Sequence, residues 1–183
     1  MNLPNALTVG RIFLVPLLVV VLLTKFEGRM IMGIPKELVG AAIFGLASLT
    51  DALDGYLARR RNQITPFGQL MDPLADKLLV TAALISLVQL DLAPAWMVTV
   101  ILLREFAVTV LRSRAHDRGM IIPASPLGKF KMVSQVIAIL LLILGGDHVP
   151  QFVLLGKIAL WIAMLTAVAS AFDYYRRFAQ SGL

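Results

Sequence analysis

Six uncharged, largely apolar runs alternate with charged segments along the chain. They cover residues 12–24, 38–50, 78–90, 92–103, 132–146 and 158–172, so each run is 12 to 15 residues long. A helix needs about 20 apolar residues to cross a bilayer. Taken alone, each run is therefore closer in length to a buried helix of a soluble protein.

A charged residue borders each run at one end, and at five of the six places no strong helix breaker stands next to the charge. The six residues are Arg11, Asp51, Lys77, Arg104, Lys131 and Asp173. We expect the helices to continue for one or two turns past these charges, which restores a spanning length. Charges within membrane segments are costly and usually face one another or water, so we expect one shared polar cavity. Arg11, Lys77 and Asp173 could instead extend to the lipid headgroups.

The composition favours a membrane protein over a soluble domain. Apolar residues make up 58% of the chain and charged residues 15%, against about 45–50% and about 25% in soluble domains. If the N-terminus is cytoplasmic and the chain crosses six times, only Lys25, Arg29, Lys36 and Lys157 of the 17 basic residues lie outside. The positive-inside rule expects this distribution. We predict an all-α integral membrane protein with six transmembrane helices, cytoplasmic termini and a polar cavity open to the cytoplasm.

The net charge limits the classes of partner that the chain could bind, and the cysteine content limits the kinds of site that it could form. The net charge is +6, and most basic residues flank apolar runs, which favours anionic membrane lipids as partners and argues against nucleic acid. The chain has no cysteine, which excludes disulfides, thiolate zinc sites and a cysteine nucleophile. Residues 1–183 show no repeat or soluble insertion, so we expect a single domain. Small residues at 40–48 would permit either close helix packing or a homodimer contact.

Four aspartates occur at helical spacing on two consecutive predicted helices. The pattern is Asp51-x2-Asp54-Gly55-x2-Ala58-Arg59-x8-Gly68-x3-Asp72-x3-Asp76. Residues at i, i+3, i+4 and i+7 share one helix face, so the first two carboxylates lie beside two small residues. Asp72 and Asp76 share a face of the next helix, and Pro73 suits the first turn of that helix.

Four facing carboxylates require cations, because like charges repel strongly at such distances. Oxygen ligands without His or Cys favour Mg²⁺, Mn²⁺ or Ca²⁺ over zinc. Two such ions are suited to displacement at phosphorus. Gly55 and Ala58 leave room for a diphosphate, and Arg59 can bind phosphate in a bidentate manner. Helix caps or scattered ion pairs with residues 59–61 would explain single aspartates but not the whole spacing.

The aspartate pattern resembles the signature of the CDP-alcohol phosphotransferase family, and every element of that signature is present. The resemblance implies that family's helical bundle and a metal-dependent transfer of a phosphatidyl group from CDP-diacylglycerol to an alcohol, with release of CMP. It implies two Mg²⁺ or Mn²⁺ ions and a catalytic base, Asp76, that deprotonates the acceptor hydroxyl. The implied metal ligands are Asp51, Asp54, Asp72 and Asp76. The implied contacts to CDP-diacylglycerol are Asn5, Thr8, Gly55, Arg59 and Thr65.

Three further stretches are similar to a bacterial branch of this family whose acceptor is sn-glycerol 3-phosphate and whose product is phosphatidylglycerol phosphate. Residues 1–11 are similar to its N-terminal segment, which lies along the membrane surface and helps to close the nucleotide pocket. The other two are Arg104-Glu105-Phe106 with Arg112, and residues 127–135, where Met132 replaces the usual Thr. This resemblance implies a bacterial cytoplasmic membrane protein with its active site on the cytoplasmic side.

Four cations on two successive predicted helices support an anionic acceptor. They are Arg104, Arg112, Lys129 and Lys131. Arg104 and Arg112 lie about two turns apart and share a helix face, so they can orient the phosphate of sn-glycerol 3-phosphate. Adjacent helix residues point about 100° apart, so we expect Arg104 and Glu105 to be poor partners. Positive-inside topology alone is an alternative explanation for Lys129.

Rival functions remain at this point. The same reaction class could use another acceptor, such as an inositol phosphate, serine or phosphatidylglycerol. A divalent-cation transporter would also place acidic residues in a membrane, but it predicts carboxylates near the midplane and paired helix breaks in two halves. The sequence shows neither feature. A scaffold protein would have no use for four inward-facing aspartates.

Overall fold

The computed structural model describes the backbone of residues 3–25, 30–61, 66–117, 126–146 and 149–181, and the side chains of 9–25, 30–50, 74–115, 127–146 and 149–179. These residues form six α-helices, as the sequence predicts. The helices are α1 (Leu3–Leu23), α2 (Lys36–Arg61), α3 (Pro66–Gln89), α4 (Ala95–Asp117), α5 (Pro126–Gly145) and α6 (Pro150–Ser181). Two short strands, β1 (Met30–Ile31) and β2 (Ile34–Pro35), pair antiparallel between α1 and α2.

The helices continue past the charged residues that border the apolar runs. Asp51 lies within α2, Arg104 within α4 and Asp173 within α6, and each helix runs for about two further turns or more. No proline or turn residue follows these charges directly, so the hydrogen-bond ladder is not interrupted. The predicted extension of the helices is confirmed.

Three of the helices begin at a proline, namely α3 at Pro66, α5 at Pro126 and α6 at Pro150. The first N–H groups of a helix have no intrahelical acceptor, so the missing N–H of proline costs little there. The prediction that Pro73 lies in the first turn of its helix is wrong. The helix already begins at Pro66, and Pro73 lies within α3.

Two of the described helical segments are long and apolar enough to cross a membrane, Leu127–Gly145 in α5 and Pro150–Ala179 in α6. Val9–Leu23 in α1 is a shorter apolar segment. The described side chains of α2 and α3 cover only residues 36–50 and 74–89, which are shorter than a membrane span, and α4 carries Arg104, Glu105, Arg112 and Arg114. Six helices are therefore present in the described residues, and four of the six spans stay a prediction.

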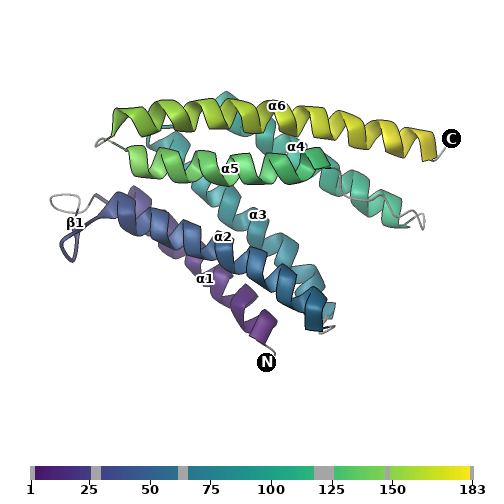
Figure 1. Ribbon diagram of the computed structural model, residues 1–183, viewed down its shortest axis with the longest axis horizontal. Helices are drawn as coiled ribbons and strands as arrows, with labels where there is room; N and C mark the ends of the chain where they lie inside the picture. Colours follow the sequence, from purple (N-terminus) through teal and green to yellow (C-terminus); the bar gives the residue numbers. More distant parts are fainter. Residues whose placement is uncertain (1–2, 26–29, 62–65, 118–125, 147–148, 182–183) are drawn as a thin grey trace.

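The helices form a bundle in which consecutive helices run in alternating directions (Figure 1). α1 packs against both α2 and α3, and α6 packs along α5 and α4. α2 and α3 also contact α5, and α3 contacts α4. The N-terminus, the end of α2 and the start of α3 lie together at one end of the first three helices, away from the strand pair (Figure 1). The residues of the aspartate pattern therefore gather at that end.

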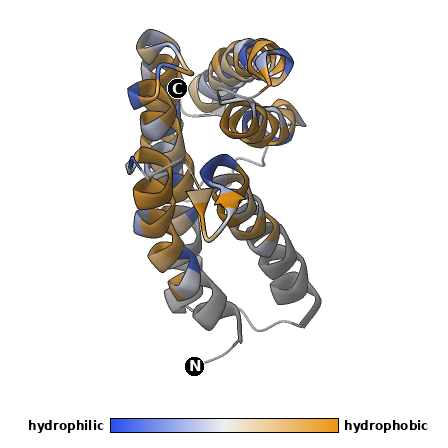
Figure 2. Cartoon of the chain, turned by 90° about the vertical axis from the view of Figure 1, so that its left-hand side faces the viewer, coloured by the Kyte–Doolittle hydropathy of each residue, from blue (hydrophilic) through white to orange (hydrophobic). Residues whose placement is uncertain are grey.

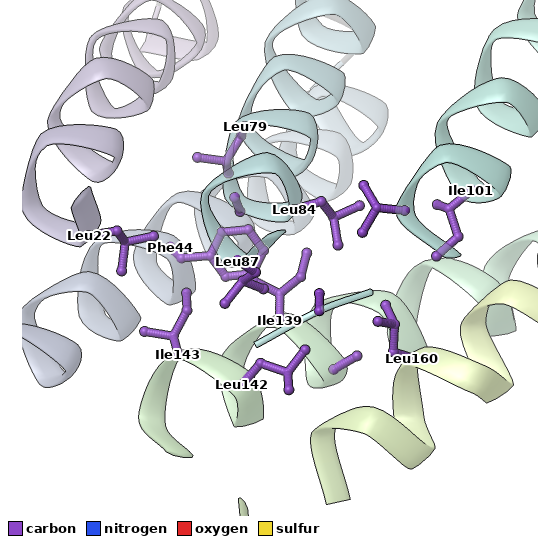
Figure 3. Close-up of a cluster of buried hydrophobic side chains, with 14 of the residues drawn as sticks. Leu22, Phe44, Leu79, Leu84, Leu87, Ile101, Ile139, Leu142, Ile143 and Leu160 are labelled. Carbon is purple, nitrogen blue, oxygen red and sulfur yellow. The ribbon is translucent and has the colours of Figure 1, made fainter. Parts of the chain in front are cut away.

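One apolar core joins all six helices (Figure 3). Phe44 of α2 is fully buried at its centre, among side chains such as Leu87 of α3 and Ile139 of α5. Close helix approach depends on glycine at Gly40, Gly145 and Gly156 among the described residues. A Cβ on Gly40 would lie 2.7 Å from Cδ2 of Leu22, so Gly40 itself packs against α1, and a homodimer contact through the other small residues at 40–48 stays a prediction.

The helices are hydrophobic along most of their length (Figure 2), and many of their large apolar side chains lie on the outer surface of the bundle. Phe13, Phe106 and Leu103 are 72%, 72% and 64% exposed, and many other large apolar side chains are more than half exposed. A soluble monomer rarely exposes contiguous apolar surface on this scale. The surface is that of a membrane protein.

Candidate active site

A cavity of about 350 Å³ lies between α3, α4 and α5. This volume falls within the range of about 300–1,000 Å³ that is typical of small-molecule sites. Its polar lining residues are Asp76, Lys77, Thr81, Glu105, Thr109, Lys131 and Gln135, and its apolar ones are Leu74, Val80, Leu102, Phe106, Met132 and Val136. The cavity therefore joins a charged region to an apolar wall, as a site for an amphiphilic ligand would.

Asp76, the predicted base, lines this cavity from α3 and is partly buried. Its carboxylate interacts electrostatically with Lys77 and with Lys131. Lys131, a predicted ligand of the acceptor phosphate, lines the same cavity from α5. The structure thus brings a predicted base and a predicted anion-binding cation to one cavity.

The other three aspartates lie on the helices that flank the connection between α2 and α3. Asp54 precedes the end of α2 at Arg61 by about 10 Å along the helix axis, and Asp72 follows the start of α3 at Pro66 by a similar rise. The backbones of Asp54 and Asp72 therefore lie at comparable distances from the α2–α3 connection, and Asp51 lies about one turn further along α2. The side chains of Asp51, Asp54, Asp72, Asn5, Thr8, Gly55 and Arg59 lie outside the described ones, and Thr65 lies outside the described residues.

The predicted metal centre falls mostly outside the described side chains. Within residues whose side chains are described, no group of three or more His, Asp or Glu could hold a metal ion. Asp76 is the one described member of the predicted ligand set. All four predicted ligands are carboxylates, the donors that Mg²⁺ and Mn²⁺ prefer, so the residue types fit the predicted ions.

Glu105 links two of the predicted acceptor-binding cations. Its Oε1 lies 2.5 Å from Nζ of Lys131 and 2.8 Å from Nη1 of Arg104. The expectation that Arg104 and Glu105 are poor partners is therefore wrong. Their Cβ atoms diverge around the helix, but the long arginine side chain bends back to Glu105. Lys131 of α5 attracts the same carboxylate and holds it in place.

Arg104 and Arg112 share one face of α4, as predicted, and this face packs on α6. Arg104 donates hydrogen bonds from Nε to the carbonyl of Ala167 at 3.0 Å and from Nη2 to Oγ of Ser170 at 2.7 Å. The guanidinium of Arg112 lies 5.8 Å from the ring centroid of Tyr174. Both arginines thus contact α6 rather than line the cavity.

Lys129 is exposed and does not line the cavity. Of the four predicted acceptor-binding cations, Lys131 alone is a lining residue of this cavity, within the described part of the chain. Arg104 is joined to it through Glu105. The roles of these cations toward an acceptor stay predictions.

Five polar lining residues were not predicted as site residues from the sequence: Lys77, Thr81, Glu105, Thr109 and Gln135. Nζ of Lys77 donates a hydrogen bond to Oγ1 of Thr109 and so joins α3 to α4. Gln135 is only 2% exposed, and its Nε2 has no hydrogen-bond partner among the described residues. A polar residue within an apolar membrane run is a functional signal. In the sequence analysis Gln135 is the last residue of the stretch 127–135 that resembles the family branch, but no role is predicted for it there.

The chain resembles known proteins over nearly its whole length. The sequence profile of the CDP-alcohol phosphatidyltransferase family matches residues 1–169. The chain is 48% identical to the CDP-diacylglycerol–glycerol-3-phosphate 3-phosphatidyltransferase of Bacillus subtilis, over 96% of this chain and 94% of that protein. It is 38% identical to the protein of the same name from Rickettsia typhi, over 96% of both chains. It is 41% identical to the probable phosphatidylglycerophosphate synthase of Mycobacterium tuberculosis, over 96% of this chain and 81% of that protein.

Proposed function

The chain belongs to the CDP-alcohol phosphatidyltransferase family, and from this premise we propose that it transfers the phosphatidyl group of CDP-diacylglycerol to sn-glycerol 3-phosphate. The products are phosphatidylglycerol phosphate and CMP. The family resemblance found in the aspartate spacing is confirmed by the full-length relatives. The observation that carries the assignment to a site is that Asp76 and Lys131 line one cavity, on different helices.

Asp76 acts as the base in this proposal. It accepts the proton of the primary hydroxyl of the acceptor, and the oxygen forms a bond to the phosphorus that carries the diacylglycerol. The bond between this phosphorus and the bridging oxygen of the diphosphate breaks, and CMP leaves with the bonding electrons. A carboxylate close to the acceptor hydroxyl can contribute a rate factor of about 10² to 10⁴ as a general base.

Lys131 binds the phosphate of the acceptor, and the other predicted cations attract it. Lys131 is 7% exposed and lies at the cavity, where burial strengthens its interaction with an anion. Glu105 holds its ammonium group in position at 2.5 Å. Arg104, Arg112 and Lys129 add positive charge at the same end of α4 and α5. This field would favour a phosphorylated alcohol over a neutral one.

Asp51, Asp54, Asp72 and Asp76 would hold two Mg²⁺ or Mn²⁺ ions. The ions, when bound, neutralise negative charge on the diphosphate and on the leaving group. The four residues come from adjacent ends of α2 and α3, which contact each other. Carboxylates on these two helices and a cavity that reaches Asp76 support this assignment.

The nucleotide part of CDP-diacylglycerol binds on the side of α1 and α2. Gly55 allows the diphosphate to approach the backbone of α2, and Arg59 and Thr65 follow it toward the start of α3. Asn5 and Thr8 lie on the first turns of α1, whose N-terminal end lies near the end of α2 (Figure 1). We propose that residues 1–11 lie along the membrane surface and close this pocket.

The protein acts in the bacterial cytoplasmic membrane as a single six-span domain with both termini on the cytoplasmic side. The alternating helices place the C-terminal ends of α2, α4 and α6 at the same end of the bundle as the N-terminal ends of α1, α3 and α5, and β1 and β2 at the opposite end (Figure 1). With this topology, 13 of the 17 basic residues fall on the cytoplasmic side. Anionic lipids would surround that end, and a homodimer is compatible with this arrangement.

CMP release by the detergent-purified chain tests the proposal. The assay contains CDP-diacylglycerol and Mg²⁺, and it is run without acceptor and with sn-glycerol 3-phosphate, an inositol phosphate, serine or phosphatidylglycerol. We expect release that depends on sn-glycerol 3-phosphate. Release that depends on another alcohol would keep the family assignment and overturn the acceptor. No release with any alcohol would overturn the function.

A further inference from the structure

The side chain of Gln135 occupies an unusual position for an amide. It lies on α5, is 2% exposed and lines the cavity that contains Asp76. Its Nε2 has no hydrogen-bond partner among the described residues. A buried amide donor without a partner is costly, and most buried polar groups are satisfied. A ligand in the cavity is a natural source of the missing acceptor.

Gln135 lies close to the two groups that we propose to bind the acceptor, Lys131 and Asp76. Gln135 follows Lys131 by four residues, so the two side chains lie on the same face of α5, one turn apart. Asp76 enters the same cavity from α3. The cavity therefore has three polar groups of different character: a carboxylate, an ammonium group and a neutral carboxamide.

These three groups match the three polar groups of sn-glycerol 3-phosphate. The phosphate requires a cation, and the attacking primary hydroxyl requires a base. The remaining secondary hydroxyl is uncharged and offers an oxygen acceptor to a neutral N–H donor. The predicted contacts to the nucleotide come from α1, α2 and the α2–α3 connection, whereas Gln135 comes from α5.

We propose that Nε2 of Gln135 donates a hydrogen bond to the secondary hydroxyl of the acceptor and thereby determines acceptor specificity. The inference rests on the proposed function, because it names a contact to the acceptor of that reaction. Three separate contacts also fix the handedness of the acceptor. Gln135 therefore contributes to the selection of sn-glycerol 3-phosphate over its mirror image and over alcohols that lack the secondary hydroxyl.

A comparison of two acceptors tests this contact directly. The second acceptor is 3-hydroxypropyl phosphate, which keeps the primary hydroxyl and the phosphate and lacks the secondary hydroxyl. CMP release from CDP-diacylglycerol is measured with each acceptor for the full-length chain and for Gln135→Met, which keeps the side-chain length and removes the donor. We expect the unmodified chain to prefer sn-glycerol 3-phosphate by about tenfold in kcat/KM. In Gln135→Met we expect the preference to fall to within about twofold, while kcat/KM for 3-hydroxypropyl phosphate changes little.

Ser134→Ala is the matched control. Ser134 is the preceding residue on α5, is buried, and its Oγ donates to the carbonyl of Lys131 at 2.9 Å, so it is already satisfied within the helix. This variant should keep the tenfold preference. If Gln135→Met does not fold, as judged by thermal melting in detergent, Gln135→Asn takes its place. It retains the amide but withdraws it from the cavity, and it should also lose the preference.

The outcomes separate this inference from the function on which it rests. An unchanged preference in the folded Gln135 variant overturns the inference, and so does an unmodified chain that uses both acceptors equally. In either case glycerol-phosphate-dependent release still supports the function. An unmodified chain that releases no CMP with either acceptor overturns the function, and this inference falls with it.

Discussion

Replacing Glu105 with Gln removes the negative charge that lies between Arg104 and Lys131. The Glu105 carboxylate contacts both cations, at 2.8 Å and 2.5 Å. Removing one partner of a buried ion pair costs about 3–5 kcal/mol. The side chain of Glu105 is 25% exposed, against 8% for Lys131, and glutamine keeps one oxygen acceptor. We therefore reduce the expected loss of unfolding free energy to about 2 kcal/mol.

Thermal melting of the detergent-purified chain, followed by circular dichroism, measures this loss. A destabilisation of about 2 kcal/mol lowers the Tm of a chain of this size by about 4–8 °C. Asp173→Asn is the matched control, because the Asp173–Arg177 pair, at 3.1 Å, is one-third to one-half exposed and should contribute less than about 1 kcal/mol.

A double-mutant cycle with Lys131→Met tests whether the ion pair itself is the cause. The two substitutions should be coupled, because either one removes the same interaction. Effects that add to within about 0.5 kcal/mol would refute the reasoning. A Tm for Glu105→Gln equal to that of Asp173→Asn would refute it as well.

Three further predictions concern the site and the helix packing. Asp76→Asn should lower glycerol-phosphate-dependent CMP release by at least about 100-fold without a comparable change in Tm, and a variant that keeps a tenth of the activity would exclude Asp76 as the base. Chelation of divalent cations with EDTA should abolish CMP release and added Mg²⁺ should restore it; activity that persists in the chelator would contradict the metal assignment. Gly156→Ala should destabilise the chain by about 1–3 kcal/mol, because its Cβ would lie 2.7 Å from Cγ and 3.1 Å from N of Leu142. Gly10→Ala should not destabilise the chain, because no atom of another element lies within 4 Å of the new Cβ. Equal Tm values for the two variants would contradict the packing argument.

The number of helices could be predicted from the sequence because two local signals agree. The apolar runs mark the helices, and the absence of breakers after charges such as Asp51 and Arg104 predicts that the helices continue. The start of α3 could not be predicted as well. Both Pro66 and Pro73 suit a first helical turn, and the local pattern alone does not distinguish them.

The contacts around Glu105 depend on tertiary structure. A helical wheel places Arg104 and Glu105 on different faces. It considers neither the length of the arginine side chain nor contacts from other helices, such as that of Lys131 on α5. The partner of Lys77, Thr109, comes from another helix for the same reason. The aspartate spacing, in contrast, indicates its chemistry before any fold is known. The roles of Asp51, Asp54 and Asp72 stay predictions from that spacing.

Transfer of labelled glycerol phosphate into lipid is the most direct test of the central claim. The purified chain, in liposomes with CDP-diacylglycerol and Mg²⁺, receives radiolabelled sn-glycerol 3-phosphate, and both released CMP and chloroform-soluble label are counted. We expect one labelled lipid molecule for each CMP released. CMP release without label in the lipid phase would contradict it, because the chain would then hydrolyse CDP-diacylglycerol rather than transfer its phosphatidyl group.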